Sequence, residues 1–116
     1  MITVKRIYEQ PSDVNGYRIL VDRLWPRGIK KEKAKIDLWM KEIAPSDELR
    51  VWFSHDPSKW NEFKKRYFSE LEHNTEVKVL LSLCIKKDVV FLFSAKDSEK
   101  NNATALKEYI ESIMKQ

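Results

Sequence analysis

RILVDRLWPRG, residues 18–28, is the stretch of sequence that decides the fold. Its run of consecutive apolar residues predicts a strand over residues 18–22 that is covered on both faces. The strand leads directly into Asp22 and Arg23, and the following Trp-Pro-Arg-Gly sequence predicts a bend that carries Arg27. This pattern is typical of a buried strand that delivers one carboxylate and two guanidinium groups to one edge of a sheet.

Periodicity on both sides of this stretch predicts the remaining elements. The run VVFLF at residues 89–93 predicts a central strand, and β-branched and aromatic residues predict another strand at residues 2–8. Helices are expected at residues 30–34, at 47–53 with Ser46 as the N-cap, at 57–73 with Asp56 as the N-cap, at 77–86, and beyond Ser98, which we expect to cap the last helix. Residues 11–16 predict a turn or a single helical turn. Residues 36–43 fit either periodicity, and we expect them to be mostly extended.

Interleaved strands and helices predict a small three-layer α/β domain that spans residues 1–116, with a mostly parallel sheet. The connection between the first two strands is short for a parallel crossover, so these strands are either antiparallel or not adjacent. In such a sheet, ligands bind outside the carboxyl ends of the strands.

Composition limits the classes of function. The formal net charge of +4 permits a nucleic-acid or phosphate partner without demanding one. The single cysteine, Cys84, excludes an internal disulfide and a cysteine-rich metal site. The two histidines and the scattered carboxylates show no metal-ligand spacing, so we expect no metal, and we also expect no cofactor. The sequence shows no signal-peptide apolar region and no apolar run of membrane-spanning length, so we expect a cytoplasmic protein without membrane contact.

Three segments of the chain resemble a known family. They are VDRLWPRG (residues 21–28), DLWMKEIAPSDELRVWFSHDPSKWNEFKKRY (37–67) and SAKDSEKNNATALKEY (94–109). Together they are similar to the YeaO-like branch of the domain-of-unknown-function family 488, over about residues 6–109. The resemblance implies a Rossmann-like α/β sandwich and no settled activity. Longer relatives carry Asp-Val-Arg where Asp22 and Arg23 stand here, and Cys-Ala-Glu where this chain has Ser94-Ala95-Lys96, so their thiol chemistry is not implied for this chain.

Asp22 and Arg23 are the first candidates for a site. Arg23 could bind a phosphate, sulfate or carboxylate bidentately, with Asp22 orienting it or acting as a base. The alternative is a structural ion pair that holds the following loop, because a polar pair after an apolar strand must be satisfied. Arg27 could bind the same anion, with Gly28 allowing close approach of the backbone, or it could be a solvated residue of a rigid turn.

Three further residues complete the candidate site. His55 could act as an acid or base near neutral pH, or it could be an ordinary loop histidine. Lys96 and Asp97 follow the last strand and are expected at the same edge of the sheet as Asp22. Asp97 is about as well explained as a cap of the last helix, whose backbone N–H groups could themselves hold an anion.

Two functions of different class follow from these residues. The first is a binding site for a small anionic molecule that bears a phosphate or carboxylate, with or without catalysis by Asp22 or His55. The second is a non-catalytic module that binds nucleic acid or protein through its basic residues. We favour the first, because the net charge is modest and no nucleic-acid recognition motif is present.

Overall fold

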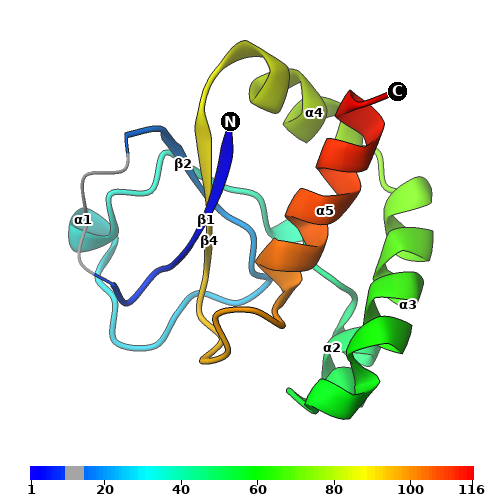
Figure 1. Ribbon diagram of the computed structural model, residues 1–116. Helices are drawn as coiled ribbons and strands as arrows, with labels where there is room; N and C mark the ends of the chain where they lie inside the picture. Colours follow the sequence, from blue (N-terminus) through cyan, green and yellow to red (C-terminus); the bar gives the residue numbers. More distant parts are fainter. Residues whose placement is uncertain (10–14) are drawn as a thin grey trace.

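The computed structural model describes residues 1–9 and 15–116, and its sheet is built from four strands that all run parallel. The strands are β1 (Ile2–Arg6), β2 (Tyr17–Leu20), β3 (Leu38–Trp39) and β4 (Val89–Phe93), in the spatial order β1-β4-β2-β3. Figure 1 shows the sheet to one side of the long helices. The α/β prediction is therefore confirmed. The turn expected at residues 11–16 lies mostly outside the described residues.

β4 is the centre of the sheet, as its apolar sequence predicts. All five of its residues are buried, and it pairs with β1 on one side and with β2 on the other. The first two strands are consequently not adjacent, which is the second of the two arrangements left open by the short connection. Both are parallel to β4, so the carboxyl ends of β1, β2 and β4 lie at one edge of the sheet.

The helical elements follow the predicted order, except for one short 3₁₀ helix at residues 41–43, in a segment that was predicted to be mostly extended. They are α1 (Lys31–Ala34), η1 (Lys41–Ile43), α2 (Asp47–Phe53), η2 (Pro57–Lys59), α3 (Trp60–Glu72), α4 (Glu76–Lys86) and α5 (Asn102–Met114). Ser46 and Asp56 accept hydrogen bonds from the backbone N–H groups of Leu49 and Ser58, so both predicted N-caps are confirmed. No helix in the described part of the chain is long and apolar enough to cross a membrane.

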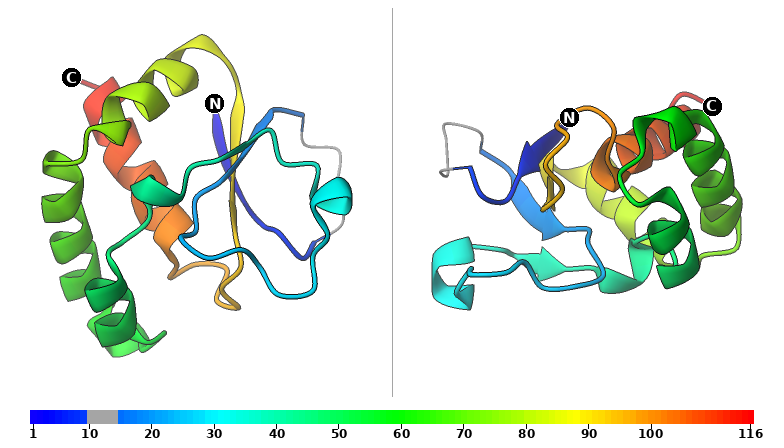
Figure 2. Two further views of the ribbon diagram at one scale, coloured as in Figure 1. Left: turned by 180° about the vertical axis from the view of Figure 1, so that it is seen from behind. Right: turned by 90° about the horizontal axis from the view of Figure 1, so that it is seen from below.

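The two faces of the sheet are covered unequally. The long helices α3, α4 and α5 all lie on one face, and α1 lies on the other (Figure 2). On the helical face, Ile19 and Phe91 pack into a large core that includes Tyr67 and Leu106. The opposite face is smaller. It consists of Ile7, Leu20, Val90 and Leu92, covered by Trp25, Ile29, Ile36 and Trp39.

Two local predictions need correction. Residues 36–43 are only briefly extended, because β3 has two residues and the chain then turns through η1. The last helix is capped by Asn101 rather than by Ser98 or Asp97. The reason is local: the Asp97 carboxylate accepts hydrogen bonds from the N–H groups of Glu99 and Lys100, which forms a separate turn before the helix begins.

Candidate functional site

A pocket of about 890 Å³ lies at the carboxyl ends of the parallel strands. It is lined by residues that follow β1, β2 and β4, by α2 and the residues after it, and by the start of α5. Six of the predicted site residues line it, namely Asp22, Arg23, Arg27, His55, Lys96 and Asp97. Gly28 does not. The structure thus brings most of the predicted residues together, and what each can do follows from its contacts.

Asp22 is held by hydrogen bonds from three elements. Its Oδ2 atom accepts from the backbone N–H of Ser94 at 2.9 Å and from the Ser94 hydroxyl at 2.7 Å. Its Oδ1 atom accepts from Nδ2 of Asn102 at 3.0 Å, and its backbone carbonyl accepts from Trp39 Nε1 at 2.7 Å. Asp22 therefore joins the end of β2 to β3, to the end of β4 and to α5. A carboxylate engaged in this way is built to hold the sheet edge together.

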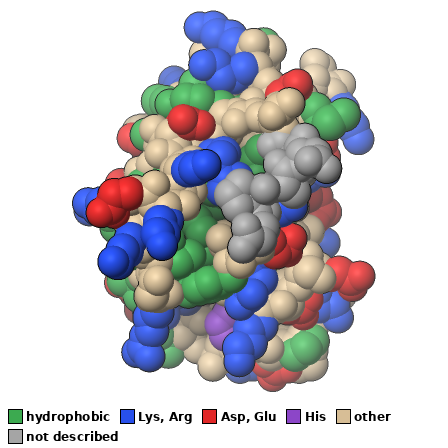
Figure 3. Space-filling view, turned by 90° about the vertical axis from the view of Figure 1, so that its left-hand side faces the viewer, with side chains coloured by type: hydrophobic (Ala, Val, Ile, Leu, Met, Phe, Trp, Pro, Cys, Tyr) green, Lys and Arg blue, Asp and Glu red, His purple; other side chains and the backbone are tan. Residues whose placement is uncertain are grey.

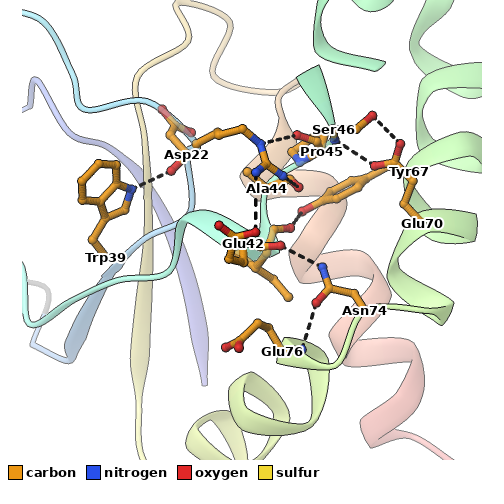
Figure 4. A network of polar contacts seen from close by, with 12 residues as sticks. Asp22, Trp39, Glu42, Ala44, Pro45, Ser46, Tyr67, Glu70, Asn74 and Glu76 are labelled. Atoms are coloured by element: carbon orange, nitrogen blue, oxygen red, sulfur yellow. Dashed lines mark hydrogen bonds and ion pairs between the residues drawn. The ribbon is translucent and has the colours of Figure 1, made fainter. Parts of the chain in front are cut away.

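Arg23 is turned toward the backbone of residues 44–45. Its Nη2 donates to the carbonyl of Ala44 at 3.1 Å, and its Nε donates to that of Pro45 at 3.3 Å. Its Nη1 lies 3.7 Å from Glu42 Oε2, and the side chain is only 25% exposed. Through these contacts the guanidinium joins a polar network along residues 42–46. Figure 4 shows Glu42, Ala44, Pro45 and Ser46 in this network. Its planar fork is thus already largely engaged by protein oxygens.

The same segment is anchored from the α3 side. The hydroxyl of Tyr67 donates to the Ile43 carbonyl at 2.7 Å, and the N–H and hydroxyl of Ser46 both donate to the Glu70 carboxylate (Figure 4). Burial, followed by the negative charges of Glu70 and Asp22, raises the pKa of Tyr67 well above its ordinary value. The neutral phenol therefore stays a hydrogen-bond donor at physiological pH. This network makes the wall behind Arg23 rigid.

Arg27 differs from Arg23 because its guanidinium is exposed and its position is set through the backbone. The Arg27 carbonyl accepts from the Tyr8 hydroxyl at 3.0 Å, which ties the loop to the residue that follows β1. Gly28 has a φ of 75°, a left-handed conformation that favours glycine, and among the described residues a Cβ there would meet nothing within 4 Å. Gly28 therefore shapes the turn that presents Arg27.

Lys96 and Asp97 both follow β4, but Lys96 is exposed whereas the Asp97 carboxylate accepts hydrogen bonds from nearby backbone N–H groups. Lys96 is exposed at the pocket. The hydrogen bonds that Asp97 receives from the N–H groups of Lys100 and Glu99 hold the pKa of its carboxyl below the usual range, and electrostatic interaction with Lys100 and His55 acts in the same direction. Asp97 is therefore a carboxylate at neutral pH, and it already occupies N–H groups that an anion could have used.

His55 lies at a strained corner between α2 and η2. Ser54 and His55 have φ values of 45° and 57°, so two consecutive non-glycine residues are left-handed. The imidazole ring lies 6.4 Å from the ring of Phe53 and is exposed at the pocket. Its neighbour Asp56 caps η2, as expected, so it serves the helix and not the histidine.

Several pocket residues were not predicted from the sequence, among them Tyr8, Arg50 and Val51, whose side chains are exposed. Arg50 and Val51 lie on the outward side of α2, and Tyr8 follows β1. Val51 carried a signal, because it is an apolar residue on a helix face whose other members are polar. Tyr8 would follow from the strand-end rule once β1 is known to be parallel to β4. Arg50 carried no signal, because it resembles any solvated helix arginine, and its ion pair with Asp47 at 3.4 Å is local.

The balance of charge at the pocket is positive. Arg23, Arg27, Arg50 and Lys96 line it against Asp22 and Asp97. Among the described residues, no carboxylate lies within ion-pair distance of the Arg27 guanidinium or the Lys96 ammonium. On the face shown in Figure 3, Lys and Arg side chains border a hydrophobic patch, and a histidine lies among basic side chains. The described residues contain no group of three His, Cys, Asp or Glu side chains that could hold a metal ion.

Comparison with known proteins assigns this chain to a family. The family model of the inactive DUF488-N3 subclade matches residues 1–116. The chain belongs to this DUF488 subclade. Its DUF488 relatives include the uncharacterized protein YeaO of Escherichia coli K12, which is 42% identical over 113 residues, covering 97% of this chain and 98% of YeaO. The uncharacterized protein Rv3073c of Mycobacterium tuberculosis H37Rv is 34% identical over 109 residues, covering 94% and 92%.

The resemblance expected from residues 21–28, 37–67 and 94–109 is thereby confirmed for the DUF488 family. No solved structure shows a significant match to this DUF488 chain. The names of these relatives state no substrate or partner, so the function has to be argued from the pocket.

Proposed function

We propose that the pocket at the carboxyl ends of β2 and β4 binds a small anionic molecule without turning it over. The observation that carries this proposal is the convergence of Arg27, Arg50 and Lys96, which come from three separate segments, on one pocket of about 890 Å³. That volume is in the range of small-molecule sites, which is about 300–1,000 Å³. Cations outnumber carboxylates in the lining of this pocket, and such an excess of positive charge favours a negatively charged occupant.

Arg27 and Lys96 are the groups that would contact the anion. Both are exposed at the pocket and lack an ion-pair partner among the described residues, so binding would not require an existing contact to break. Arg50 could join them, because its pair with Asp47 links two exposed side chains, and such pairs contribute little. The start of α5 lies at the same pocket, and the positive end of its dipole adds to the attraction.

Arg23 would then support the site from behind. Its hydrogen bonds to the Ala44 and Pro45 carbonyls hold the pocket wall, and its remaining N–H groups lie near Glu42. This favours Arg27 over Arg23 as the residue that binds the ligand. Gly28 contributes to the site by shaping the turn that presents Arg27.

Three features support binding without catalysis. The carboxylate of Asp22 is engaged by Ser94 and Asn102, so it is poorly placed to accept a proton from a ligand. The family resemblance implies a cysteine in longer relatives where this chain has Ser94, and the subclade that matches the chain is described as inactive. The side chain of His55 is exposed at the pocket, and we assign it to ligand contact.

A thermal-shift screen tests this proposal. The library would contain inorganic phosphate, sulfate, sugar phosphates, mononucleotides and carboxylates. A ligand that binds only the folded protein raises the melting temperature, and at 100 times its Kd it contributes about 2.7 kcal/mol. We expect hits with the wild type that disappear in the double variant Arg27→Ala/Lys96→Ala. The control Lys78→Ala/Lys115→Ala removes the same charge from α4 and from the C-terminal end of α5, away from the pocket. An equal loss in this control would contradict a specific site.

A basic segment beside the pocket supports a second candidate, binding of nucleic acid. Lys30, Lys31, Lys33 and Lys35 are all exposed on and around α1, directly after the loop that carries Arg27. Phosphate contacts release counterions, so affinity for DNA or RNA would fall steeply with salt. Fluorescence anisotropy with a labelled single strand at several salt concentrations tests this candidate. Undetectable binding at low salt would eliminate it.

A further inference from the structure

Two large apolar side chains are exposed at the pocket, and neither belongs to a core cluster. Leu24 is 60% exposed and Val51 is 65% exposed, and both line the pocket. Leu24 follows β2, and Val51 lies on α2, so they come from segments that are far apart in sequence. A single exposed apolar residue needs no explanation, but two at one pocket mark a surface that could be covered by a ligand.

Each of these apolar residues has a cation close to it in the chain. Leu24 shares its loop with Arg27, and Val51 directly follows Arg50. All four residues line the pocket. Two separate segments therefore present the same combination, an apolar side chain together with a guanidinium. The rest of the lining is also largely apolar, since Trp25, Pro45 and Phe53 contribute to it.

We propose that the occupant is an amphipathic organic anion, a compact aromatic or other apolar body that carries a phosphate or carboxylate. This inference rests on the proposed function and names the ligand class of the same pocket. Inorganic phosphate would fill only a small part of about 890 Å³ and would leave Leu24 and Val51 in water. An apolar body between these side chains removes their surface from water, while Arg27 and Lys96 hold the charge.

The test compares two probes that carry the same charged group. Methyl phosphate has almost no apolar surface, and 1-naphthyl phosphate has a flat apolar body. Isothermal titration calorimetry would measure both against the wild-type chain. We expect 1-naphthyl phosphate to bind at least ten-fold more tightly than methyl phosphate. Equal affinities would overturn the inference and leave the proposed anion site standing, and binding of neither probe would overturn both.

Variants separate the two halves of the ligand. Leu24→Ala/Val51→Ala should weaken 1-naphthyl phosphate at least five-fold and leave methyl phosphate unchanged. Arg27→Ala/Lys96→Ala should weaken both probes. The control Val79→Ala/Ile85→Ala truncates two exposed apolar residues of α4 that do not line the pocket, and it should change neither affinity. All of these side chains are exposed, so the variants are expected to fold, which the melting temperature checks.

Two results would replace the inference with another explanation. If uncharged 1-naphthol bound as tightly as 1-naphthyl phosphate, the pocket would be apolar without anion selectivity, and both proposals would fail. If sedimentation showed that the wild type self-associates and that Leu24→Ala/Val51→Ala abolishes this association, the two residues would serve contact between copies of the chain. The ligand-class inference would then be overturned.

Discussion

Ser94 donates two hydrogen bonds to one oxygen of Asp22, from its backbone N–H at 2.9 Å and from its hydroxyl at 2.7 Å. The two residues follow β4 and β2, which are neighbours in the sheet, so this contact closes the sheet edge at the pocket. The other oxygen of Asp22 accepts from Asn102 of α5. The residue that sequence reasoning placed first as an acid or base is therefore the link between two strands and a helix.

Asp22→Asn should destabilise the fold by about 2 kcal/mol. The amide keeps one acceptor oxygen, and its NH₂ group must then face donors of Ser94 or Asn102. Ser94→Ala removes only the hydroxyl donor and keeps the backbone N–H, so it should cost about 1 kcal/mol. Urea unfolding monitored by tryptophan fluorescence measures both. If Asp22→Asn cost no more than Ser94→Ala, the carboxylate would not hold the sheet edge as described.

Arg23→Ala and Arg27→Ala should separate stability from binding. Arg23→Ala leaves the partly buried Ala44 and Pro45 carbonyls without their donor and should cost about 1–2 kcal/mol. Arg27→Ala removes an exposed side chain and should change the free energy of unfolding by less than about 0.5 kcal/mol. Binding of 1-naphthyl phosphate should show the opposite order, with the larger loss for Arg27→Ala. If Arg23→Ala, measured where that variant is fully folded, lost more affinity than Arg27→Ala, then Arg23 would be the residue that binds the anion.

Ser54→Gly should stabilise the chain by about 0.5–1 kcal/mol. Ser54 has a φ of 45° at the end of α2, a conformation that glycine adopts without strain. The matched control is Ser69→Gly, which places glycine inside the helix α3 and should destabilise by about 0.5 kcal/mol. Thermal unfolding of both variants checks the pair. A shift of the same sign in both would show that the corner at Ser54 is not strained.

Cys84 should resist alkylation at pH 8 in the folded protein. Burial raises the pKa of this thiol to about 11, from an ordinary value of 9.0. Because the folded pKa is raised, the contribution of the neutral thiol to stability is fully present below about pH 9 and is lost as the pH rises toward 11. Mass spectrometry after iodoacetamide treatment follows the reaction, with urea-unfolded protein as the reactive control. Equal rates in the two states at pH 8 would contradict the buried thiol.

The sequence predicted the elements best where the interaction that determines an element involves only residues within that short segment. The apolar run of β4 needs cover on both faces, and Ser46 and Asp56 satisfy N–H groups two or three residues away. The prediction failed where several neighbouring residues could serve the same structural role. Asp97, Ser98 and Asn101 can all cap a helix, and the turn that Asp97 makes with Glu99 and Lys100 decides in favour of Asn101.

The candidate site shows the same division. The strand-end rule brought Asp22, Arg27 and Lys96 to one edge without knowledge of any contact. It could not show that Asp22 meets Ser94 and Asn102, because these partners are more than 70 residues away in the chain. Partners at such separation depend on strand order and helix placement, which no local pattern contains.

A titration of ¹⁵N-labelled protein with 1-naphthyl phosphate, followed by ¹H–¹⁵N NMR, tests the central claim most directly. We predict that the shifted amides fall in residues 22–28, 50–55 and 94–97, which form the pocket, and that these shifts are absent in Arg27→Ala/Lys96→Ala. Shifts confined to residues 30–35, or no shifts at millimolar ligand, would contradict a binding site for anions at the carboxyl ends of the strands.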